Sequence, residues 1–451
     1  MGVSIEKTAE KLQRLLQMGD AEALKEYLSQ LQPADIAEIV DLLSETRRRQ
    51  VFESLDIEMA TRTFESMGSK TQNEVITSLP TPLAVSILGK MSSDDLADLL
   101  GDIEKKDAEK ILSLIPEEAE SLRELMQHPE NTAGGLMTLD VISIKDNATV
   151  EQAFYYLRTT KPDSDIVYYV YVVNNRNQLV GVVSLRQLIT ASPGTKVGDI
   201  ASTNVISVPA DMDQEEVARI FEKYDLLALP VVDSNMHLLG VVTVDDVIDV
   251  IREETTEDIS RMGGQEPLDE PYLSARVFSM VRKRIGWLLI LFAAQSVTGN
   301  ILAFFEESLE TVIALAFFIP LLIDTAGNAG AQASTLVVRA MAMGEVTFKN
   351  FMKVVSRESL VGLSLGVIMA VVAFFWSRFI ITGANPGIGY TVSLTIFAII
   401  ALASTLGAAL PIVAKSLRFD PAVASAPLIT TIADATGLII YFTIARAVLN
   451  L

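Results

Sequence analysis

The sequence has no cysteine and only two histidines, His128 and His237, among 451 residues. The chain therefore forms no disulfide, iron–sulfur cluster, thiol nucleophile or cysteine-ligated zinc site, and two-histidine zinc motifs are excluded as well. A metal ion bound here would be a hard cation held by oxygen. Basic residues are also scarce, with 36 Lys and Arg against 57 Asp and Glu, and the net charge of −21 argues against nucleic-acid binding.

Apolar residues are abundant and unevenly placed. Half of the chain is hydrophobic and the mean hydropathy is +0.35, which predicts a membrane domain. Residues 276–451 hold 12 basic and 8 acidic residues, a net +4, whereas residues 1–275 hold 24 and 49, a net −25. The start of the chain lacks the apolar run of a signal peptide, and Glu6 stands where a myristoylation motif needs Ser or Thr. We therefore expect the acidic part in the cytoplasm.

The apolar part contains five segments long enough to cross a bilayer core of about 30 Å. They lie near residues 285–305, 311–338, 358–377, 391–414 and 421–445. Lys and Arg concentrate before the first segment and in every second loop after it, whereas the loop after the first segment holds Glu306, Glu307 and Glu310. The positive-inside rule then places the C-terminus outside the cell.

An internal repeat occupies the middle of the chain. Residues 141–144 (VISI) recur as 205–208 (VISV), and residues 179–184 (LVGVVS) recur as 238–243 (LLGVVT), with about five extra residues in the first copy near 161–165. Each copy has the pattern of strand, helix, strand, strand and helix. The repeat resembles a tandem pair of CBS domains, an α/β module whose two copies pack into one globule.

Many CBS pairs bind adenine nucleotides through a Ser or Thr that stands three residues before an Asp. The second copy has this pair in Thr243 and Asp246, whereas Ser184 of the first copy is followed by Gln187, which offers the ribose no charged acceptor. Ser184, Arg186, Thr243 and Asp246 are the residues expected to contact a nucleotide, with ATP as the candidate. A purely structural module is the alternative.

The first 130 residues have short helical patterns separated by Pro33, Gly68, Pro80 and Pro82. Helices that repeat every 10 to 16 residues indicate a superhelix stabilised by stacking of neighbours. Ser93 is the expected N-cap of one helix, on which Asp94 and Asp98 share a face. These acids either favour the positive end of the helix dipole or form half of a divalent-cation site.

A second acidic helix should connect the repeat to the membrane domain. It begins at residue 244, ends at Gly263 and Gly264, and carries seven acids: Asp245, Asp246, Asp249, Glu253, Glu254, Glu257 and Asp258. Four of the acids stand four residues apart, a spacing that costs an isolated helix about 0.2 to 0.5 kcal/mol per like-charged pair. Magnesium or calcium bound to oxygen ligands would offset this repulsion, and a solvated acidic face is the alternative.

Two aspartates lie well inside the apolar segments, Asp324 and Asp434. Each would cost about 3 kcal/mol at mid-bilayer if it faced lipid, so both must face protein or water. Nearby Pro and Gly are expected to loosen the helices and expose carbonyls, and Asn328, Gln332 and Thr430 add neutral oxygens. This pattern predicts an oxygen-lined pore, whereas helix-packing contacts of small polar residues are the alternative.

The whole chain resembles the MgtE family of magnesium channels. Residues 324–332 (DTAGNAGAQ) and 434–437 (DATG) carry the resemblance most specifically. It implies a homodimer with a pore on the two-fold axis, where Asp434 holds a hydrated magnesium ion, and regulatory magnesium between the cytosolic domains. The acids that match the regulatory sites are Asp94, Asp98, Asp213, Glu215, Asp225, Asp246, Asp249, Glu254, Glu257 and Asp258.

The sequence departs from the family at three places. Ala326 stands where the family commonly has Gly, and Ala426 stands where Gly or Asn is usual. Arg62 lies near the position of an acid that is expected to complete a cation site in the N-terminal domain. One site between the domains is therefore expected to be incomplete.

The resulting hypothesis is a multidomain, non-enzymatic magnesium channel of the cell membrane. It has an all-α superhelical domain (1–131), α/β CBS domains (132–200 and 201–250), an acidic connecting helix (251–275) and a five-helix transmembrane domain (276–451). Cytosolic magnesium is expected to bridge the acids and close the pore. A proton-coupled divalent-cation transporter and a membrane magnesium sensor that conducts nothing are the alternatives.

Overall fold

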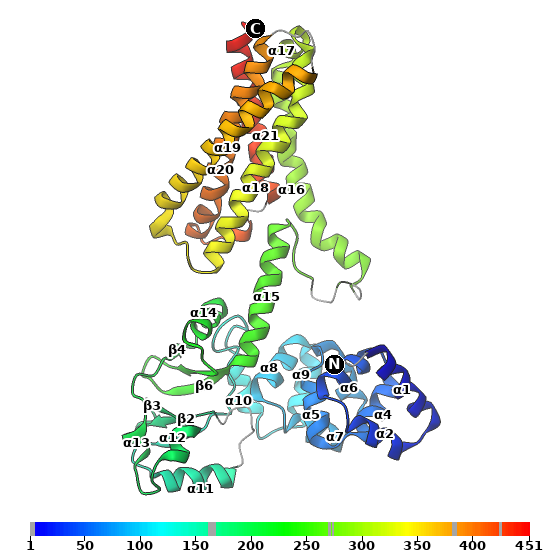
Figure 1. The fold of residues 1–451 in the computed structure, drawn as a ribbon. Coiled ribbons are helices and arrows are strands. Elements are labelled where there is room, and N and C mark those ends of the chain that lie inside the picture. The colour runs from blue at the N-terminus through cyan, green and yellow to red at the C-terminus, as the bar shows by residue number, and fades with distance from the viewer. Residues whose placement is uncertain (1–4, 161–167, 269–271, 273–274, 381–385, 424–425) are drawn as a thin grey trace. The chain divides into compact units, whose positions relative to one another are not determined.

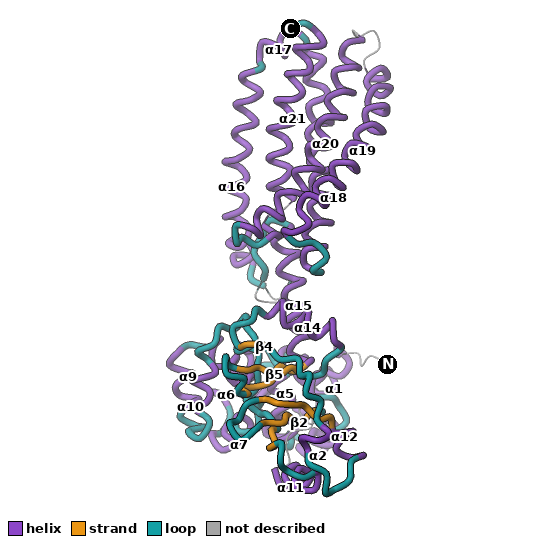
Figure 2. Tube along the Cα trace, turned by 90° about the vertical axis from the view of Figure 1, so that its left-hand side faces the viewer, coloured by secondary structure: helices purple, strands orange, loops and turns teal. Residues whose placement is uncertain are grey.

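The computed structural model describes residues 5–160, 168–268, 272, 275–380, 386–423 and 426–451. The chain divides into two compact units, Met1–Ile251 and Arg252–Leu451, which are described separately (Figure 1). Strands occur in the first unit, and the described part of the second unit is helical (Figure 2). The five extra residues expected near 161–165 lie outside the described residues.

Ten short helices begin the first unit. They are α1 (Ile5–Met18), α2 (Ala21–Leu28), α3 (Pro33–Asp41), α4 (Glu45–Ser54), α5 (Ile57–Glu65), α6 (Ser69–Ser78), α7 (Thr81–Leu88), α8 (Ser93–Asp102), α9 (Lys105–Leu112) and α10 (Ala119–Leu125). Helices two apart pack together, as in α3 on α5, α5 on α7, and α6 on α8. This stacking confirms the predicted superhelix.

Local sequence explains where these helices begin. The side chains of Asp20 and Asp56 accept hydrogen bonds from the backbone N–H groups of Ala23 and Met59, which cap α2 and α5. Pro33 occupies the first position of α3, where its missing N–H costs nothing. Apolar residues at helical spacing form one continuous buried core along the stack.

The CBS pair follows as two copies with one topology. The first contains β1 (Ser143–Lys145), α11 (Val150–Thr160), β2 (Tyr169–Val173), β3 (Leu179–Ser184), α12 (Leu185–Thr190) and α13 (Val197–Ile200). The second contains β4 (Val208–Pro209), α14 (Gln214–Tyr224), β5 (Ala228–Val232), β6 (Leu238–Thr243) and α15 (Val244–Met262). In each sheet the central strand pairs parallel to the first strand and antiparallel to the third. The predicted repeat is therefore confirmed.

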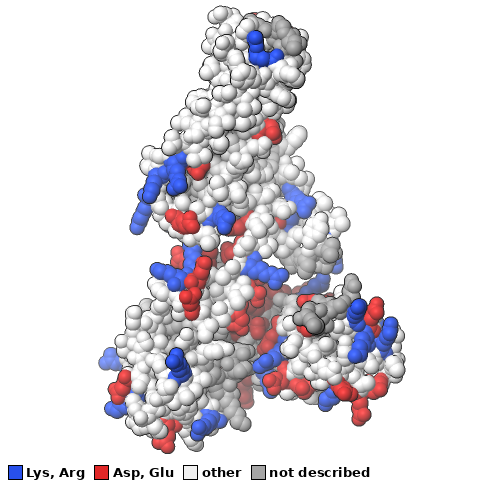
Figure 3. Space-filling model, viewed as in Figure 1, with Lys and Arg blue, Asp and Glu red and all other residues white. Residues whose placement is uncertain are grey.

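Five apolar helical segments of membrane-spanning length make up most of the second unit. They are Val277–Phe304, Ile313–Ala342, Phe348–Phe379, Pro386–Ser416 and Ala426–Leu449. Their main helices are α16 (Val277–Phe304), α18 (Ile319–Ala342), α19 (Phe351–Ile380), α20 (Pro386–Ser416) and α21 (Ala426–Leu449), with the short α17 (Glu306–Thr311) after the first. Much of the visible surface of this unit carries no charged side chain (Figure 3).

Close helix packing at α18 depends on small residues. α18 packs against both α20 and α21. A Cβ added to Gly407 of α20 would stand 2.2 Å from the carbonyl oxygen of Gly330 in α18, and one added to Gly330 would meet the Ile429 side chain at 2.7 Å. Such contacts let helix backbones approach in a membrane, where packing rather than water exclusion drives association. These glycines therefore bring α21 and its acid next to α18.

We predict that Gly407→Ala lowers the thermal stability of the purified chain in detergent, because the new methyl group collides with backbone that cannot move aside. Overpacking of this kind costs about 1 to 3 kcal/mol. Thermal unfolding followed by loss of the folded peak in gel filtration measures the effect. Gly299→Ala on α16 is the matched control, since its new Cβ would have no atom within 4 Å. Equal stability of the two variants would contradict the proposed packing.

Candidate cation-binding sites

The membrane unit brings polar side chains from three helices to one place. Asp434 lies on α21, Gln295 on α16 and Asp324 on α18. Gln295 Nε2 donates a hydrogen bond to Asp434 Oδ2 at 3.4 Å, and Asp324 is close enough for its charge to act on Asp434. The two predicted intramembrane acids are therefore neighbours, although they are 110 positions apart in the sequence.

Asp434 is the buried member of this group, with 8% of its surface exposed. Its Oδ1 atom is inaccessible and has no hydrogen-bond partner, while the long contact from Gln295 partly satisfies Oδ2. An ionised carboxylate out of water is costly without a positive partner or several donors. The arrangement therefore leaves Asp434 with unused capacity to bind a cation.

Asp324 begins an exposed polar line along α18. Asp324, Asn328 and Gln332 are four residues apart, so they share one face of the helix, and all three are exposed. Asn328 Nδ2 donates to Asp324 Oδ2 at 3.0 Å. A polar face at this depth must meet water or another protein surface, since lipid offers no hydrogen bonds.

Thr430 lies one turn before Asp434. Its hydroxyl donates to the carbonyl of Pro427 at 2.8 Å, and its Cγ2 methyl packs where a Cβ of Gly327 would lie. The hydroxyl proton is thus used within α21, but the oxygen retains a lone pair. The main contact of Thr430 outside its own helix is therefore its packing against Gly327 of α18.

The expected loosening of these helices is wrong. α18 is a continuous helix from Ile319 to Ala342 and α21 from Ala426 to Leu449. Pro320 and Pro427 lie in their first turns, where proline is tolerated, and Gly327 and Gly330 provide close packing rather than open backbone. The oxygens at this site therefore come from side chains.

A second group of acids lies in the first unit, where α8 meets the second CBS copy. Asp94 of α8 is buried with 8% exposure, and its Oδ1 has no partner. Asp95 Oδ2 accepts a hydrogen bond from Ser92 at 2.8 Å, and Asp246 of α15 accepts one from Thr243 at 2.5 Å. Asp98, on the same helix as Asp94, is exposed.

Serine residues fix the position of α8. The N-cap is Ser92, not the expected Ser93, because the helix begins at Ser93, one residue earlier than predicted. Ser93 instead accepts a hydrogen bond from the backbone N–H of Leu139 at 2.7 Å and contacts the Thr138 hydroxyl at 3.0 Å. These bonds join α8 to the chain that enters the CBS pair.

The carboxylates in this group disfavour one another's charged forms. Although part of its surface is exposed, desolvation by the surrounding protein, followed by the charge of Asp94 and then of Asp95, raises the pKa of Asp98 to about 7. Burial and the neighbouring Asp95 raise the pKa of Asp94, and burial and Asp94 raise that of Asp246. Repulsion among these acids is the condition under which a divalent cation binds favourably.

Sequence reasoning missed one acid near these residues, Glu130, because it belongs to a segment without a recognisable motif. Glu130 contributes to the raised pKa of Asp98, after burial and the nearer acids. Burial, together with the charges of Asp245 and Asp249, raises the pKa of Asp95. Glu130 lines a cavity of about 360 Å³ with Asp98 and His128.

Glu65 fills part of the gap expected at Arg62. Glu65, in the last turn of α5, accepts a long hydrogen bond of 3.4 Å from the backbone N–H of Ser92 at the start of α8. Arg62 is a neighbour on the same helix and reaches Glu58 at 3.9 Å. An acid, Glu65, one turn after Arg62, therefore lies beside the start of α8, and the incompleteness of a cation site here stays a prediction.

Three predicted ligands lie on α14 and have local structural roles. Asp213 caps the helix by accepting a hydrogen bond of 3.0 Å from the Glu215 N–H, and Glu215 forms an ion pair with Arg219 at 2.5 Å. Asp225 ends the helix in a left-handed conformation with φ of +50°. All three remain accessible to solvent at least in part.

The remaining predicted acids lie along α15. Asp249 is exposed and Glu254 half-buried, as is Asp258. Glu257 forms an ion pair with Arg261, which also pairs with Asp420 in the connection between α20 and α21. Asp420 Oδ1 in turn accepts a hydrogen bond of 2.7 Å from the N–H of Ala422, just before α21. The end of α15 is thus joined to the chain that leads to Asp434.

No preformed metal centre exists among the residues that the structure describes, because no three carboxylate or imidazole groups converge as ligands. Bound cations would therefore need water, backbone oxygens or a second subunit to complete their coordination.

The two CBS copies differ at the expected nucleotide position. Thr243 donates to Asp246 in the second copy. In the first, Ser184 and Gln187 form a capping box in which the Gln187 side chain accepts from the Ser184 backbone N–H at 2.9 Å. Gln187 also donates to the Ile200 carbonyl at 3.2 Å. Ser184 is therefore engaged in capping α12, and Arg186 is exposed on that helix.

The fold and the intramembrane acids define a multi-pass membrane protein with a CBS pair and an oxygen-based polar site. Family signatures agree with this class. The signature described as a divalent cation transporter, MgtE, matches residues 319–444, the MgtE intracellular N domain matches residues 31–131, and CBS domains match residues 133–194 and 197–253.

Similar proteins cover almost the whole chain. The magnesium transporter MgtE of Thermus thermophilus is 38% identical over 99% of both chains, and that of Bacillus subtilis is 34% identical over 97% of this chain and 96% of its own. The cytosolic domain of the Mg²⁺ channel MgtE in complex with ATP, a solved structure, is 39% identical with a TM-score of 0.51, and covers 54% of this chain and 99% of its own. This chain belongs to the MgtE family of divalent cation transporters.

We predict that the metal-free soluble part, residues 1–265, loses thermal stability as pH rises from about 4 to about 7. An acid whose pKa is raised by folding binds more protons in the folded state, so its contribution is present below about pH 4 and is lost as pH rises through the folded pKa near 7. Thermal melts in chelator across this range measure the effect.

Asp98→Asn should flatten this pH dependence, since the exposed side chain is neutralised without a change of shape. Glu38→Gln, an exposed acid on α3, is the matched control and should keep the wild-type slope. A wild-type stability that rises over this pH range would contradict the assignment.

Proposed function

We propose that this protein is a magnesium channel in which Mg²⁺ passes Asp434. The buried carboxylate with an unpartnered oxygen carries the proposal, because no described group neutralises it. Magnesium prefers carboxylate, carbonyl and water oxygens and releases its waters reluctantly, so a pore would recognise the hydrated ion. The same proposal divides the chain into a superhelical domain (1–131), two CBS domains (132–200 and 201–250), a connecting helix (251–275) and a transmembrane domain (276–451).

A homodimer would complete the site. A two-fold axis beside α18 and α21 would place two Asp434 side chains opposite each other, with Asp324 and Asn328 extending the polar path. The exposed polar face of α18 supports this arrangement, since it needs water or protein beside it. Entry into a cell that is negative inside favours a divalent ion by about 4.6 kcal/mol per 100 mV, so flow needs no pump.

Gln295 is proposed to orient Asp434. Its amide donates to one carboxylate oxygen and thereby leaves the other free for the ion. Sequence reasoning missed this residue, although an amide in an otherwise apolar segment was an available signal.

We predict that Asp434→Asn abolishes magnesium flux into liposomes while the protein remains folded, because the isosteric amide carries no charge. Glu307→Gln in α17, outside the proposed path, is the control and should conduct normally. Gln295→Leu should reduce flux less than Asp434→Asn does, since it removes orientation and not charge. Wild-type flux in Asp434→Asn would exclude this residue from the ion path.

Gating is proposed to use the cytosolic acids. When magnesium is scarce, repulsion separates the acidic surfaces. When it rises, the ion bridges carboxylates of α8, α14 and α15. The proposed ligands are Asp94, Asp98, Asp213, Glu215, Asp225, Asp246, Asp249, Glu254, Glu257 and Asp258. The raised pKa values of Asp98 and Asp246 support the proposal, since burial and the charges of neighbouring acids both disfavour their ionised forms. Arg261 and Asp420 would transmit the movement of α15 to α21.

We predict that residues 1–265 become more compact and more protease-resistant in millimolar magnesium, measured by small-angle scattering and limited proteolysis. The double variant Asp94→Asn and Asp246→Asn should be compact without metal, because repulsion at its centre is gone. The control pair Glu22→Gln and Glu38→Gln lies on α2 and α3 and should respond as wild type does. A scattering profile that ignores magnesium would contradict the gating scheme.

A nucleotide is a second candidate ligand of the CBS pair. The proposal is supported by the ATP complex of the similar cytosolic domain and by Thr243 and Asp246 in the second copy. The closed Ser184–Gln187 capping box favours one ATP per pair, and Arg186, exposed on α12, is a proposed contact. The proposed location is the cell membrane, with the N-terminal part in the cytoplasm and the C-terminus outside.

A further inference from the structure

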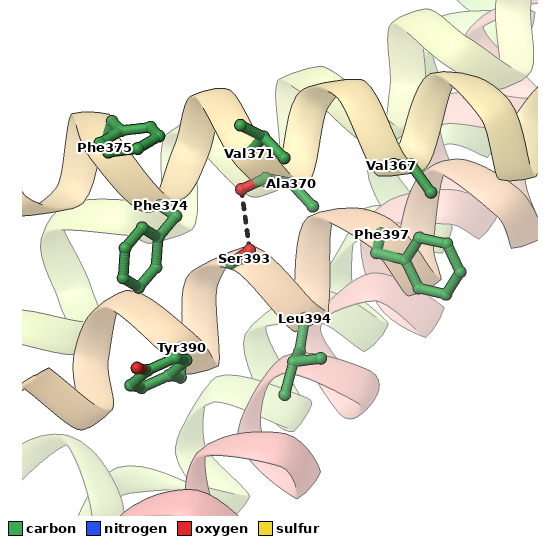
Figure 4. A pocket seen from close by; sticks show the side chains of 9 residues that line it. All are labelled: Val367, Ala370, Val371, Phe374, Phe375, Tyr390, Ser393, Leu394 and Phe397. Carbon is green, nitrogen blue, oxygen red and sulfur yellow. Dashed lines mark hydrogen bonds between the residues drawn. The ribbon is translucent and has the colours of Figure 1, made fainter.

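An apolar groove lies between α19 and α20, away from the polar site. Val367, Val371 and Phe374 line it from α19, and Tyr390, Leu394 and Phe397 from α20 (Figure 4). The groove encloses about 410 Å³, within the range of about 300 to 1,000 Å³ that is usual for ligand clefts.

The groove offers an apolar lining. Besides Tyr390, Ser393 of α20 brings a hydroxyl group to the lining. This hydroxyl donates a hydrogen bond to the Ala370 carbonyl at 2.8 Å and therefore needs no other partner (Figure 4). Phe374 and Tyr390 close one end with ring centroids 5.2 Å apart. Both helices are of membrane-spanning length and composition, so we expect the groove to open to hydrocarbon.

A cationic residue continues the same helix face. Val367, Val371, Phe374 and Arg378 are spaced by four, three and four residues, which places Arg378 about 6 Å beyond Phe374 along α19. Arg378 is exposed and forms no hydrogen bond or ion pair within the described part of the chain. Trp376 and Tyr390 lie nearby in sequence at this end, as aromatic residues do at the level of lipid headgroups.

We propose that this groove binds one anionic glycerophospholipid, with an acyl chain between α19 and α20 and the headgroup phosphate at Arg378. Arginine pairs with phosphate through two parallel hydrogen bonds. An anionic lipid is preferred because its headgroup lacks the quaternary ammonium of phosphatidylcholine, which would repel Arg378. The acyl chain fills space that the side chains leave open, and the gain comes from packing.

A second copy of the chain fits this surface less well. The stretch from residue 367 to residue 397 contains no Asp or Glu. A two-fold contact through the groove would therefore offer no carboxylate to Arg378, whereas an anionic lipid supplies the missing charge.

The test is native mass spectrometry of the full-length chain in detergent, with added phosphatidylglycerol or phosphatidylcholine. Wild type should bind phosphatidylglycerol roughly tenfold more tightly, the factor typical of one charge-assisted contact. Arg378→Gln should bind the two lipids equally. Ala370→Phe and Leu394→Trp, which fill the groove from either helix, should reduce binding of both lipids.

Matched controls separate this site from general lipid contact. Ile368→Phe places the same aromatic side chain at an exposed position of α19 that does not line the groove, and Lys349→Gln removes a cation before α19; both should behave as wild type does. Unchanged lipid binding in both groove-filling variants would overturn the proposal. Retained preference for phosphatidylglycerol in Arg378→Gln would overturn the headgroup assignment. Loss of dimers without loss of lipid in Ala370→Phe would show that a second copy occupies the groove.

Discussion

A carboxylate removed from water needs a positive partner, and the membrane helices bury Asp434 with one side-chain donor, the Gln295 amide, among the described residues. The close packing of α18, α20 and α21 around glycines holds the acid in place, and the exposed polar line on α18 lies near it. The same physical problem recurs in the first unit, where Asp94 is buried and its neighbours raise one another's pKa. At both places the proposed divalent cation would neutralise the carboxylates.

The proposed regulation uses this shared chemistry. An ion that neutralises Asp434 in transit would also neutralise the acids around α8 and α15, so the transported ion would report its own cytosolic concentration. Arg261 offers a physical link for this regulation. It lies near the end of α15 and forms an ion pair with Asp420, which precedes α21, the helix that carries Asp434. No separate sensor ligand is then required, although an ATP bound beside Thr243 would compete for the orientation of Asp246.

Periodicity and composition predicted the superhelix, the CBS repeat and all five membrane-spanning segments, because each depends on local patterns of apolar residues and on strong turn signals. Asp324 and Asp434 were also found from the sequence, since an acid in an apolar segment is costly wherever it lies. The site residues that sequence reasoning missed are brought to the sites by contacts between residues far apart in the chain. Glu65 reaches Ser92 from another helix, Glu130 joins Asp98 across a cavity, and Gln295 meets Asp434 from α16. The role of the glycines was misjudged for the same reason, since whether a glycine loosens or packs a helix depends on its neighbour.

The most direct test of the central claim is the reversal potential of current through the purified chain in a planar bilayer. A magnesium channel predicts a reversal potential that shifts by about 30 mV per tenfold magnesium gradient, as for any two-charge process, and ignores an imposed pH gradient. A potential that follows the pH gradient would show proton coupling, and the absence of magnesium current would show a sensor. Either result would contradict the account.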